Sequence, residues 1–294
     1  MDTRPISQPP DAGELRARLH GMWAAVARAW GEHAEYVDAR RASVTDRMLD
    51  LTRPRPGEHV LELACGPGGL GLAAAAWVAS DGEVVQSDVV VEMTEIAAAR
   101  ARALGISNVR TRVLDLERIA EPDRSYDVAL CSEGLMLVPE PARAAREIRR
   151  VLRPGGRVAL TVWGPRERNP WLGLVLDAVS AQLGRPVPPP GVPGPLSLAD
   201  RDGLVRLLRD AELVEVEVEE LAVPLRAATF EQWWTRTSAL TGPLAVILAA
   251  LPADALQAIR THLHTAVAPY QTPAGLELPG VTLLASARRA PMPS

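Results

Sequence analysis

Three glycines follow a short apolar run in the segment VLELACGPGGLG, residues 60–71. Gly66, Gly68 and Gly71 fit the pattern G-x-G-x-x-G, and Asp88 stands 20 residues after Gly68. Taken alone, this spacing suits a dinucleotide, whose pyrophosphate binds at the glycine turn. Glu62, four residues before Gly66, favours a different ligand, because a carboxylate there repels a pyrophosphate and attracts a cation. The segment therefore predicts a cofactor site and favours a cationic cofactor over a dinucleotide.

S-Adenosylmethionine is a ligand of this kind, since it carries an ammonium and a sulfonium group. Glycine at positions 66 and 68 lets the backbone approach the methionine and ribose portions without a Cβ in the way. Asp88 can accept hydrogen bonds from the two ribose hydroxyls. Asp115 follows the third expected strand, where a carboxylate beside a backbone amide can bind the adenine amino group and ring nitrogen.

The elements that must position these residues alternate between strands and helices from His59 onward. Short apolar runs such as HVLELA and EVVQSDV are each followed by a helical stretch, which is typical of a parallel sheet with helices on both faces. The segment VEVEVEE at 214–220 alternates strictly, which indicates a strand near a sheet edge. The run VTLLASARR at 281–289 is expected to be a seventh strand. We therefore expect an α/β fold with a doubly wound, seven-stranded, mostly parallel sheet and a helical cap.

The chain divides into six expected segments. Residues 1–50 form an N-terminal helical segment that covers the active site, with apolar residues at helical spacing from Asp11 to Trp30. The others are a cofactor-binding core (51–164), a Pro-rich lid segment (165–200), core sheet (201–220), a helical cap (221–279) and the last strand and tail (280–294). Six prolines and three glycines at 184–195 predict an exposed, mobile loop.

The chain resembles the class I S-adenosylmethionine-dependent methyltransferases, and among them the ubiquinone/menaquinone-biosynthesis-like group of small-molecule enzymes. Five segments carry the resemblance, in the usual order: ELACGPGG (62–69), QSDV (86–89), LDLE (114–117), SYDVALCSEGLMLVPEP (125–141) and EIRRVLRPGGRVALTVW (147–163). It implies a Rossmann-like sheet with an antiparallel last strand. It also implies methyl transfer from S-adenosyl-L-methionine, with S-adenosyl-L-homocysteine as product. The acceptor is an O, N or C atom of a small, partly apolar molecule such as a quinone, a phenol or a natural product.

The resemblance also implies which residues contact the cofactor. Pro67 stands where Thr is frequent in the family, which removes a hydroxyl from the glycine turn. From the methionine end through the ribose to the adenine, with Ser132 beside the methionine part, the expected contacts are Glu62, Ala64, Gly66, Pro67, Gly68, Ser132, Asp88, Val89, Met93, Asp115 and Leu116.

Two side chains are candidates for a proton acceptor. Glu133 directly follows Ser132 at the carboxyl end of the fourth strand, where apolar neighbours are expected to desolvate it and raise its pKa. His33 follows the N-terminal helix, and an imidazole already titrates near neutrality. The alternative is that neither residue acts and that an acidic phenol or enol is simply aligned for in-line displacement.

Aromatic side chains are candidates for the acceptor pocket, although tryptophans such as these can equally belong to the core. The candidates are Trp30, Tyr36, Trp163, Trp171 and Trp234.

Composition bounds the remaining possibilities. A formal charge of −4 gives no broad positive field for nucleic acid, and the arginines of 143–153 are better explained as a solvated helix face. The chain contains no lysine, which excludes a Schiff base. Cys65 and Cys131 are interpreted as buried free thiols. We expect a cytoplasmic monomer or homodimer with no membrane span and no metal site. A nicotinamide-dependent oxidoreductase and a cofactor-binding cyclase or scaffold remain as alternatives.

Overall fold

The computed structural model describes residues 12–292, so Asp11, the first ten residues and the last two lie outside it. Its centre is a seven-stranded sheet in the order β3-β2-β1-β4-β5-β10-β6. Strands β1 to β5 are parallel, and β10 runs antiparallel to both of its neighbours. The strands are β1 (His59–Leu63), β2 (Glu83–Asp88), β3 (Val109–Val113), β4 (Tyr126–Ser132), β5 (Leu152–Trp163), β6 (Leu213–Ala222) and β10 (Val281–Arg289). The expected seven-stranded, mostly parallel sheet is confirmed, and the alternating segment VEVEVEE lies in edge strand β6.

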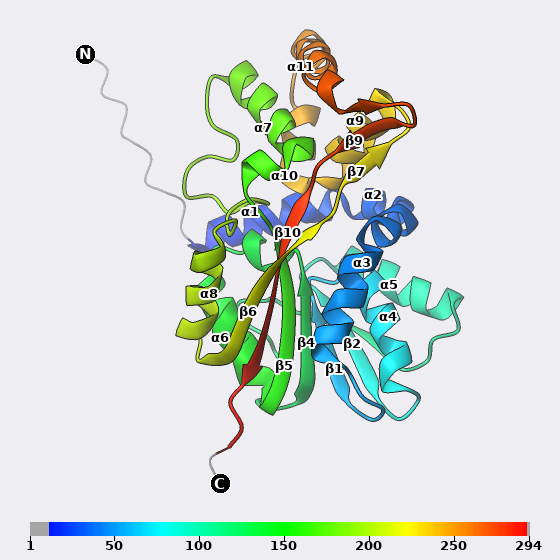
Figure 1. Cartoon of the computed structure of the whole chain (residues 1–294), viewed down its shortest axis with the longest axis vertical. Coiled ribbons are helices and arrows are strands. Elements are labelled where there is room, and N and C mark those ends of the chain that lie inside the picture. Colours follow the sequence, from blue (N-terminus) through cyan, green and yellow to red (C-terminus); the bar gives the residue numbers. More distant parts are fainter. Residues whose placement is uncertain (1–11, 293–294) are drawn as a thin grey trace, which may run out of the picture.

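Helices cover the sheet on both faces (Figure 1). α4 (Gly69–Val78) and α5 (Val91–Ala103) connect the first three strands, and α3 (Ala34–Thr52) packs against α4. α6 (Pro141–Val151) packs against α8 (Arg201–Asp210). α6 buries Ala144, Ala145, Ile148 and Val151, whose three- and four-residue spacing forms one apolar helix face. The sheet between these layers is dry, since side chains such as Leu61 and Leu160 have no exposed surface.

The remaining elements lie beyond the carboxyl ends of the parallel strands, above the sheet in Figure 1. They are α1 (Ala12–Ala24), α2 (Ala27–Glu32), α7 (Pro170–Leu183), α9 (Phe230–Leu240), α10 (Gly242–Ala249) and α11 (Ala253–Ala266), with the short strands β7 (Leu225–Ala227), β8 (Gln271–Thr272) and β9 (Gly275–Leu278). Two details differ from expectation. The N-terminal helix breaks near Val26, because α1 packs on α10 whereas α2 packs on α9 and α5. The segment 221–279 also contains the antiparallel sheet β7-β9-β8, whose strands are too short to give a periodic signal.

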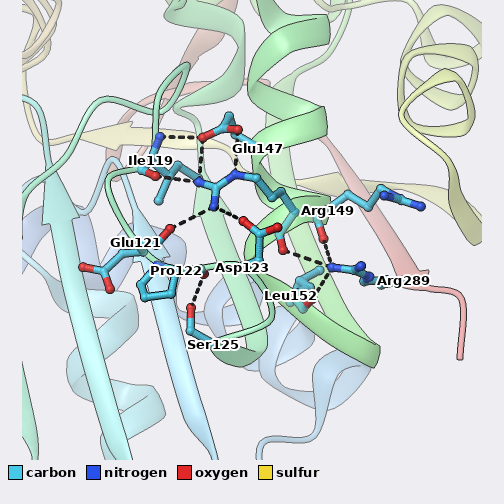
Figure 2. A network of polar contacts seen from close by, with 10 residues as sticks. Ile119, Glu121, Pro122, Asp123, Ser125, Glu147, Arg149, Leu152 and Arg289 are labelled. Carbon is cyan, nitrogen blue, oxygen red and sulfur yellow. Dashed lines mark hydrogen bonds and ion pairs between the residues drawn. The ribbon is translucent and has the colours of Figure 1, made fainter. Parts of the chain in front are cut away.

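A partly exposed polar network ties the loop between β3 and β4 to α6, as Figure 2 shows. The guanidinium of Arg150 donates to the carbonyl oxygens of Ile119 and Glu121, at 2.6 and 2.9 Å, and to both carboxylate oxygens of Glu147 at 2.8 Å. It also contacts Asp123 at 2.7 Å. This arginine is therefore a structural anchor.

Other arginines of the same helix region also have acidic partners. Arg149 pairs with Glu212, Arg153 with Asp127 and Arg143 with Glu140. These pairs agree with a solvated outer helix face better than with a free basic patch.

No helix in the described part, residues 12–292, is long and apolar enough to cross a membrane. Residues 184–195 form no helix or strand after Gly184 caps α7, and half of them are exposed.

Candidate functional site

A cavity opens over the carboxyl ends of β1 to β5. From β1 the chain adds β2 and β3 on one side of the sheet, and from β4 it adds β5 on the other side. The helices that follow β1 and β4 therefore diverge and leave a crevice between these two strands. The helices α1, α2, α3, α7 and α9 cover the crevice and contribute residues to its lining. Its lining includes predicted residues from every one of these strand ends: Glu62, Ala64, Gly66, Pro67, Asp88, Val89, Met93, Asp115, Leu116, Ser132, Glu133, Trp163 and, from the covering helices, Trp30, Tyr36 and Trp171.

Glu62 is a buried acidic group of this cavity, with 2% of its surface exposed. Its Oε2 atom accepts hydrogen bonds from the Gly71 backbone at 3.0 Å and from Gln86 Nε2 at 2.9 Å. Burial raises the pKa of Glu62 to about 8, against the opposing effect of these two bonds. The sequence interpretation missed Gln86, although its place in a buried strand was a usable signal, since a buried amide requires partners.

The glycine turn is built for close packing. Gly68 caps α4 with φ +87°, and a Cβ there would lie 2.6 Å from Gln86 Nε2. Gly68 was expected to contact the cofactor, but it does not line the cavity; its freedom from a Cβ serves the packing of Gln86 instead. Arg100 fixes the turn from outside by donating to the Pro67 carbonyl at 2.7 Å.

Asp88 ends β2 and is 9% exposed. Its two carboxylate oxygens accept the backbone N–H groups of Gly66 and Val90, each at 3.0 Å. Burial raises the pKa of Asp88, and these backbone bonds oppose the increase. The carboxylate therefore holds the glycine turn and still faces the cavity.

Asp115 lies beyond the end of β3, next to the covering helix α1. Its Oδ1 atom accepts the Glu117 backbone N–H at 2.8 Å, and Arg16 of α1 lies 3.6 Å from Oδ2. His20 of the same helix lines the cavity, and burial lowers its pKa. Neither Arg16 nor His20 was predicted, because the sequence of α1 does not indicate over which part of the sheet this helix packs.

Aromatic side chains of α1 and α2 form a wall beside Met93. Trp23 and Trp30 pack edge to face with ring centroids 6.3 Å apart, and Met93 belongs to the same buried cluster. The Trp30 Nε1 atom donates to the carbonyl oxygen of Leu240 at 3.0 Å. This bond joins the N-terminal segment to α9 across the cavity.

Glu133 follows β4 with a backbone φ of +58°, in the left-handed region, and Ala64 after β1 has φ +51°. Such conformations cost about 1–3 kcal/mol and gather at functional sites. Arg41 lies 3.5 Å from the Glu133 carboxylate and also bonds the Ser132 hydroxyl. The expected apolar surroundings of Glu133 thus include an arginine.

The far end of the cavity, over β5, is aromatic and basic. Trp163 ends β5 and packs edge to face on Trp171 of α7, with centroids 4.9 Å apart. The Arg40 guanidinium carbon lies 5.3 and 5.4 Å from these two ring centroids. Arg236 of α9 covers the Tyr36 ring at 4.0 Å. The three arginines at this end, Arg40, Arg41 and Arg236, were not predicted, although Tyr36 and Arg40 are one helical turn apart.

Besides Gly68, two predicted residues do not line the cavity. His33 lies in the junction between α2 and α3, where its backbone N–H bonds the Ala29 carbonyl. Trp234 is buried beneath Arg260, 5.7 Å from the guanidinium carbon. The residues of α9 that reach the cavity are Arg236, Thr237 and Leu240, whose three- and four-residue spacing defines a helix face that excludes position 234.

The two cysteines are buried and free. Burial raises the pKa of Cys131 to about 12 and that of Cys65 well above its ordinary value, so both remain thiols at neutral pH. Within residues 12–292 no cluster of three His, Cys, Asp or Glu side chains could hold a metal ion.

Comparison with known proteins decides the family. Residues 60–156 match the model of a methyltransferase domain. Nocamycin O-methyltransferase from Saccharothrix syringae is 34% identical over 218 residues, which cover 67% of this chain and 74% of that protein. The chain belongs to the class I S-adenosylmethionine-dependent methyltransferases.

Further matches place the methyltransferase in the small-molecule group. The ubiquinone/menaquinone biosynthesis C-methyltransferase UbiE from Ectopseudomonas mendocina is 35% identical over 133 residues, 45% of this chain and 52% of that protein. The YcgJ protein from Bacillus subtilis has the same fold, with a TM-score of 0.60 at 19% identity over 84% of this chain and 98% of that one. S-Adenosylmethionine is the methyl donor of this enzyme family, and the comparisons support this reading over a nicotinamide-dependent one.

Proposed function

We propose that the cavity binds the methyl donor across β1 to β3 and a small acidic or phenolic acceptor over β4 and β5. One observation carries the proposal: three carboxylates stand in succession along the ends of neighbouring strands. Glu62, Asp88 and Asp115 belong to β1, β2 and the end of β3, and all three line one cavity.

The residues fit the donor. In our assignment Glu62, with Ala64, Gly66 and Pro67, binds the methionine portion. No described residue donates to its Oε1 atom, which leaves an acceptor for an ammonium group. Asp88 and Val89 bind the ribose. Met93 covers one adenine face, and Asp115 with Leu116 binds the adenine edge, whereas Ser132 stands beside the methionine part.

When bound, S-adenosylmethionine supplies an electrophilic methyl group on a sulfonium. The chain's own contribution is alignment of the acceptor and exclusion of water. Trp30 and Trp23 close the cavity on the side of α1 and α2, and Trp163 and Trp171 offer an apolar surface to the acceptor.

Glu133 is our candidate for any proton acceptor, because it lines the cavity at the β4 end whereas His33 does not. The alternative stands that an already ionised acceptor needs no base. Once an acceptor is found, Glu133→Gln and His33→Gln are compared across pH, with Glu32→Gln on the surface as control. A base at Glu133 predicts a loss of about 10²- to 10⁴-fold in kcat and of the acidic pH limb. A loss below tenfold in both variants leaves alignment as the mechanism.

The proposal is tested by incubating the enzyme with methyl-labelled S-adenosylmethionine and a panel of quinones, phenols and polyketide-like acids. We expect labelled product and S-adenosylhomocysteine in equal amounts. Product formed without S-adenosylhomocysteine indicates a cyclase or scaffold instead. Titration with S-adenosylhomocysteine and with NADH tests the cofactor site separately. A protein that binds NADH but not S-adenosylhomocysteine would contradict the assignment of this site to the methyl donor.

A further inference from the structure

Arg40 is half-buried in the cavity and carries a positive charge that no acidic side chain of residues 12–292 neutralises at contact distance. Within residues 12–292 no carboxylate oxygen lies within 4.0 Å of it, and its Nε atom is buried without a hydrogen-bond partner. The neighbouring cavity arginine, Arg41, is paired with Glu133. Burial lowers the pKa of Arg40, and Glu133 gives the largest opposing effect. A guanidinium stays charged even so, because its ordinary pKa is very high.

The tryptophans beside Arg40 do not replace an anion. Cation–π contacts with Trp163 and Trp171 use the face of the guanidinium. The N–H donors lie in the guanidinium plane and remain available. An unpaired buried donor is destabilising, and more so when it is charged. Arg40 is therefore placed to bind a ligand that accepts hydrogen bonds from these N–H groups.

Two more polar atoms at this end of the cavity lack partners. The Tyr36 hydroxyl and the Thr237 Oγ1 atom are buried without a hydrogen bond, and both residues line the cavity. Tyr36 precedes Arg40 by one turn of α3, which puts the two side chains on the same helix face. Arg236 adds a second positive charge above the Tyr36 ring. Carboxylates Glu62, Asp88 and Asp115 belong to the other end.

We infer that the acceptor carries a delocalised oxyanion, a carboxylate or an ionised enol, which Arg40 binds together with the Tyr36 and Thr237 hydroxyls. This inference rests on the proposed function and narrows its acceptor class. A neutral quinone or phenol can use the hydroxyls but leaves the guanidinium without a counter-charge. In a site shielded from water, an anionic ligand binds a guanidinium more strongly than its neutral isostere does.

The test uses matched probes on the complex with S-adenosylhomocysteine. 2-Naphthoate is compared with 2-naphthamide, and 2-hydroxy-1,4-naphthoquinone, an acidic enol, with its neutral 2-methoxy ether. Binding is measured by calorimetry for the wild type, Arg40→Gln and the surface control Arg28→Gln, whose side chain is exposed and pairs with Glu32. The two pairs distinguish a carboxylate from an enolate acceptor.

We expect the wild type and Arg28→Gln to bind at least one anion about 10- to 100-fold more tightly than its neutral partner, and Arg40→Gln to lose this preference. Equal binding of the anion and its partner by the wild type overturns the inference, as does failure of both anions to bind. A preference that persists in Arg40→Gln also overturns the role of Arg40. Should that variant not fold, Arg40→Lys, which keeps the charge and loses the planar fork, is expected to show a reduced preference. If the wild type does not bind S-adenosylhomocysteine, this result contradicts the proposed function instead.

Discussion

Asp88 illustrates how one side chain serves both the fold and the ligand. Its two oxygens already hold the backbone amides of Gly66 and Val90, so removal of the carboxylate changes the glycine turn as well as a ribose contact. We therefore expect Asp88→Ala to lower the stability of the fold as well as the affinity for the cofactor. Two buried N–H groups lose their acceptor in that variant.

We predict that Asp88→Ala weakens S-adenosylhomocysteine binding by about 1.5–3 kcal/mol, the scale of hydrogen bonds to a charged group. Calorimetric titration measures the affinity, and thermal unfolding without ligand measures the separate loss of stability. Asp88→Asn keeps one carbonyl acceptor and should retain more stability than the alanine variant. Asp46→Asn on the exposed side of α3 is the control. Unchanged affinity in Asp88→Ala would contradict the ribose assignment.

Glu62 should couple cofactor binding to a proton. Burial raises its pKa to about 8, so the free protein carries it mostly protonated at neutral pH. This neutral form stabilises the fold fully below the ordinary pKa of 4.5, and that contribution is lost as pH rises through about 8. An ammonium bound at Glu62 favours the ionised form and expels the proton.

We therefore predict release of up to about one proton for each S-adenosylhomocysteine bound near pH 7, with affinity that rises as pH rises toward 8. Calorimetry in buffers of different ionisation enthalpy measures the proton count. Glu62→Gln has no proton to release and should bind without buffer dependence. The same buffer dependence in the wild type and in Glu62→Gln would assign the proton to another group.

At the scale of elements, the Arg150 anchor fixes the loop that begins at Asp115 and ends before β4 (Figure 2). The hydrogen bond from Arg150 holds the pKa of Glu147 below its ordinary value of 4.5. A depressed carboxylate pKa contributes stability above the ordinary value, and this contribution disappears as pH falls through the folded-state pKa.

We predict that Arg150→Met lowers the free energy of unfolding by about 1–3 kcal/mol at neutral pH, because Glu147 and two carbonyl groups lose a donor. Denaturant unfolding at pH 7 and below pH 4.5 measures this difference, which should shrink at the lower pH. Arg146→Met, on an exposed position of the same helix, should change little. An equal decrease of the free energy of unfolding in both variants would show that the loss of a positive charge, and not the loss of the Arg150 hydrogen bonds, causes the effect.

At the scale of the whole molecule, the site lies between a rigid sheet and a cover made of distant parts of the chain. The indole N–H of Trp30 in α2 donates a hydrogen bond to the carbonyl oxygen of Leu240 at the end of α9, and both residues line the cavity. The Pro-rich loop contributes Pro195 to the lining, although it was expected to be the mobile lid. We expect both parts to open for ligand entry.

Hydrogen exchange with and without S-adenosylhomocysteine should separate the two. We predict that ligand slows exchange in α1, α2 and the end of α9, whereas the amides of 184–195 exchange fast in the free enzyme. α8, on the far face of the sheet, is the internal reference. Uniform protection of 184–195 in the free enzyme would contradict a lid there, and unchanged exchange in α1 and α2 would contradict their role as cover.

The sequence by itself determined the sheet, the glycine turn and the three carboxylates. These depend on local patterns, since strand and helix periodicity fixes the element order and parallel strands bring their carboxyl ends to one edge. A buried strand position marks Gln86 as an amide that needs partners, but its partners and the packing role of Gly68 depend on which strand lies next to which.

Only the tertiary structure decided what covers the site. The break near Val26 and the turn at His33 set the direction of α2 and α3, and no short-range pattern encodes that direction. It puts Arg40 beside Trp163 and Trp171 and leaves His33 outside the cavity. Contacts between α1 and α10 and between α2 and α9, more than 200 residues apart in the chain, hold this arrangement. The chemistry of the acceptor end thus follows from long-range packing, which the order of residues specifies only through the folded whole.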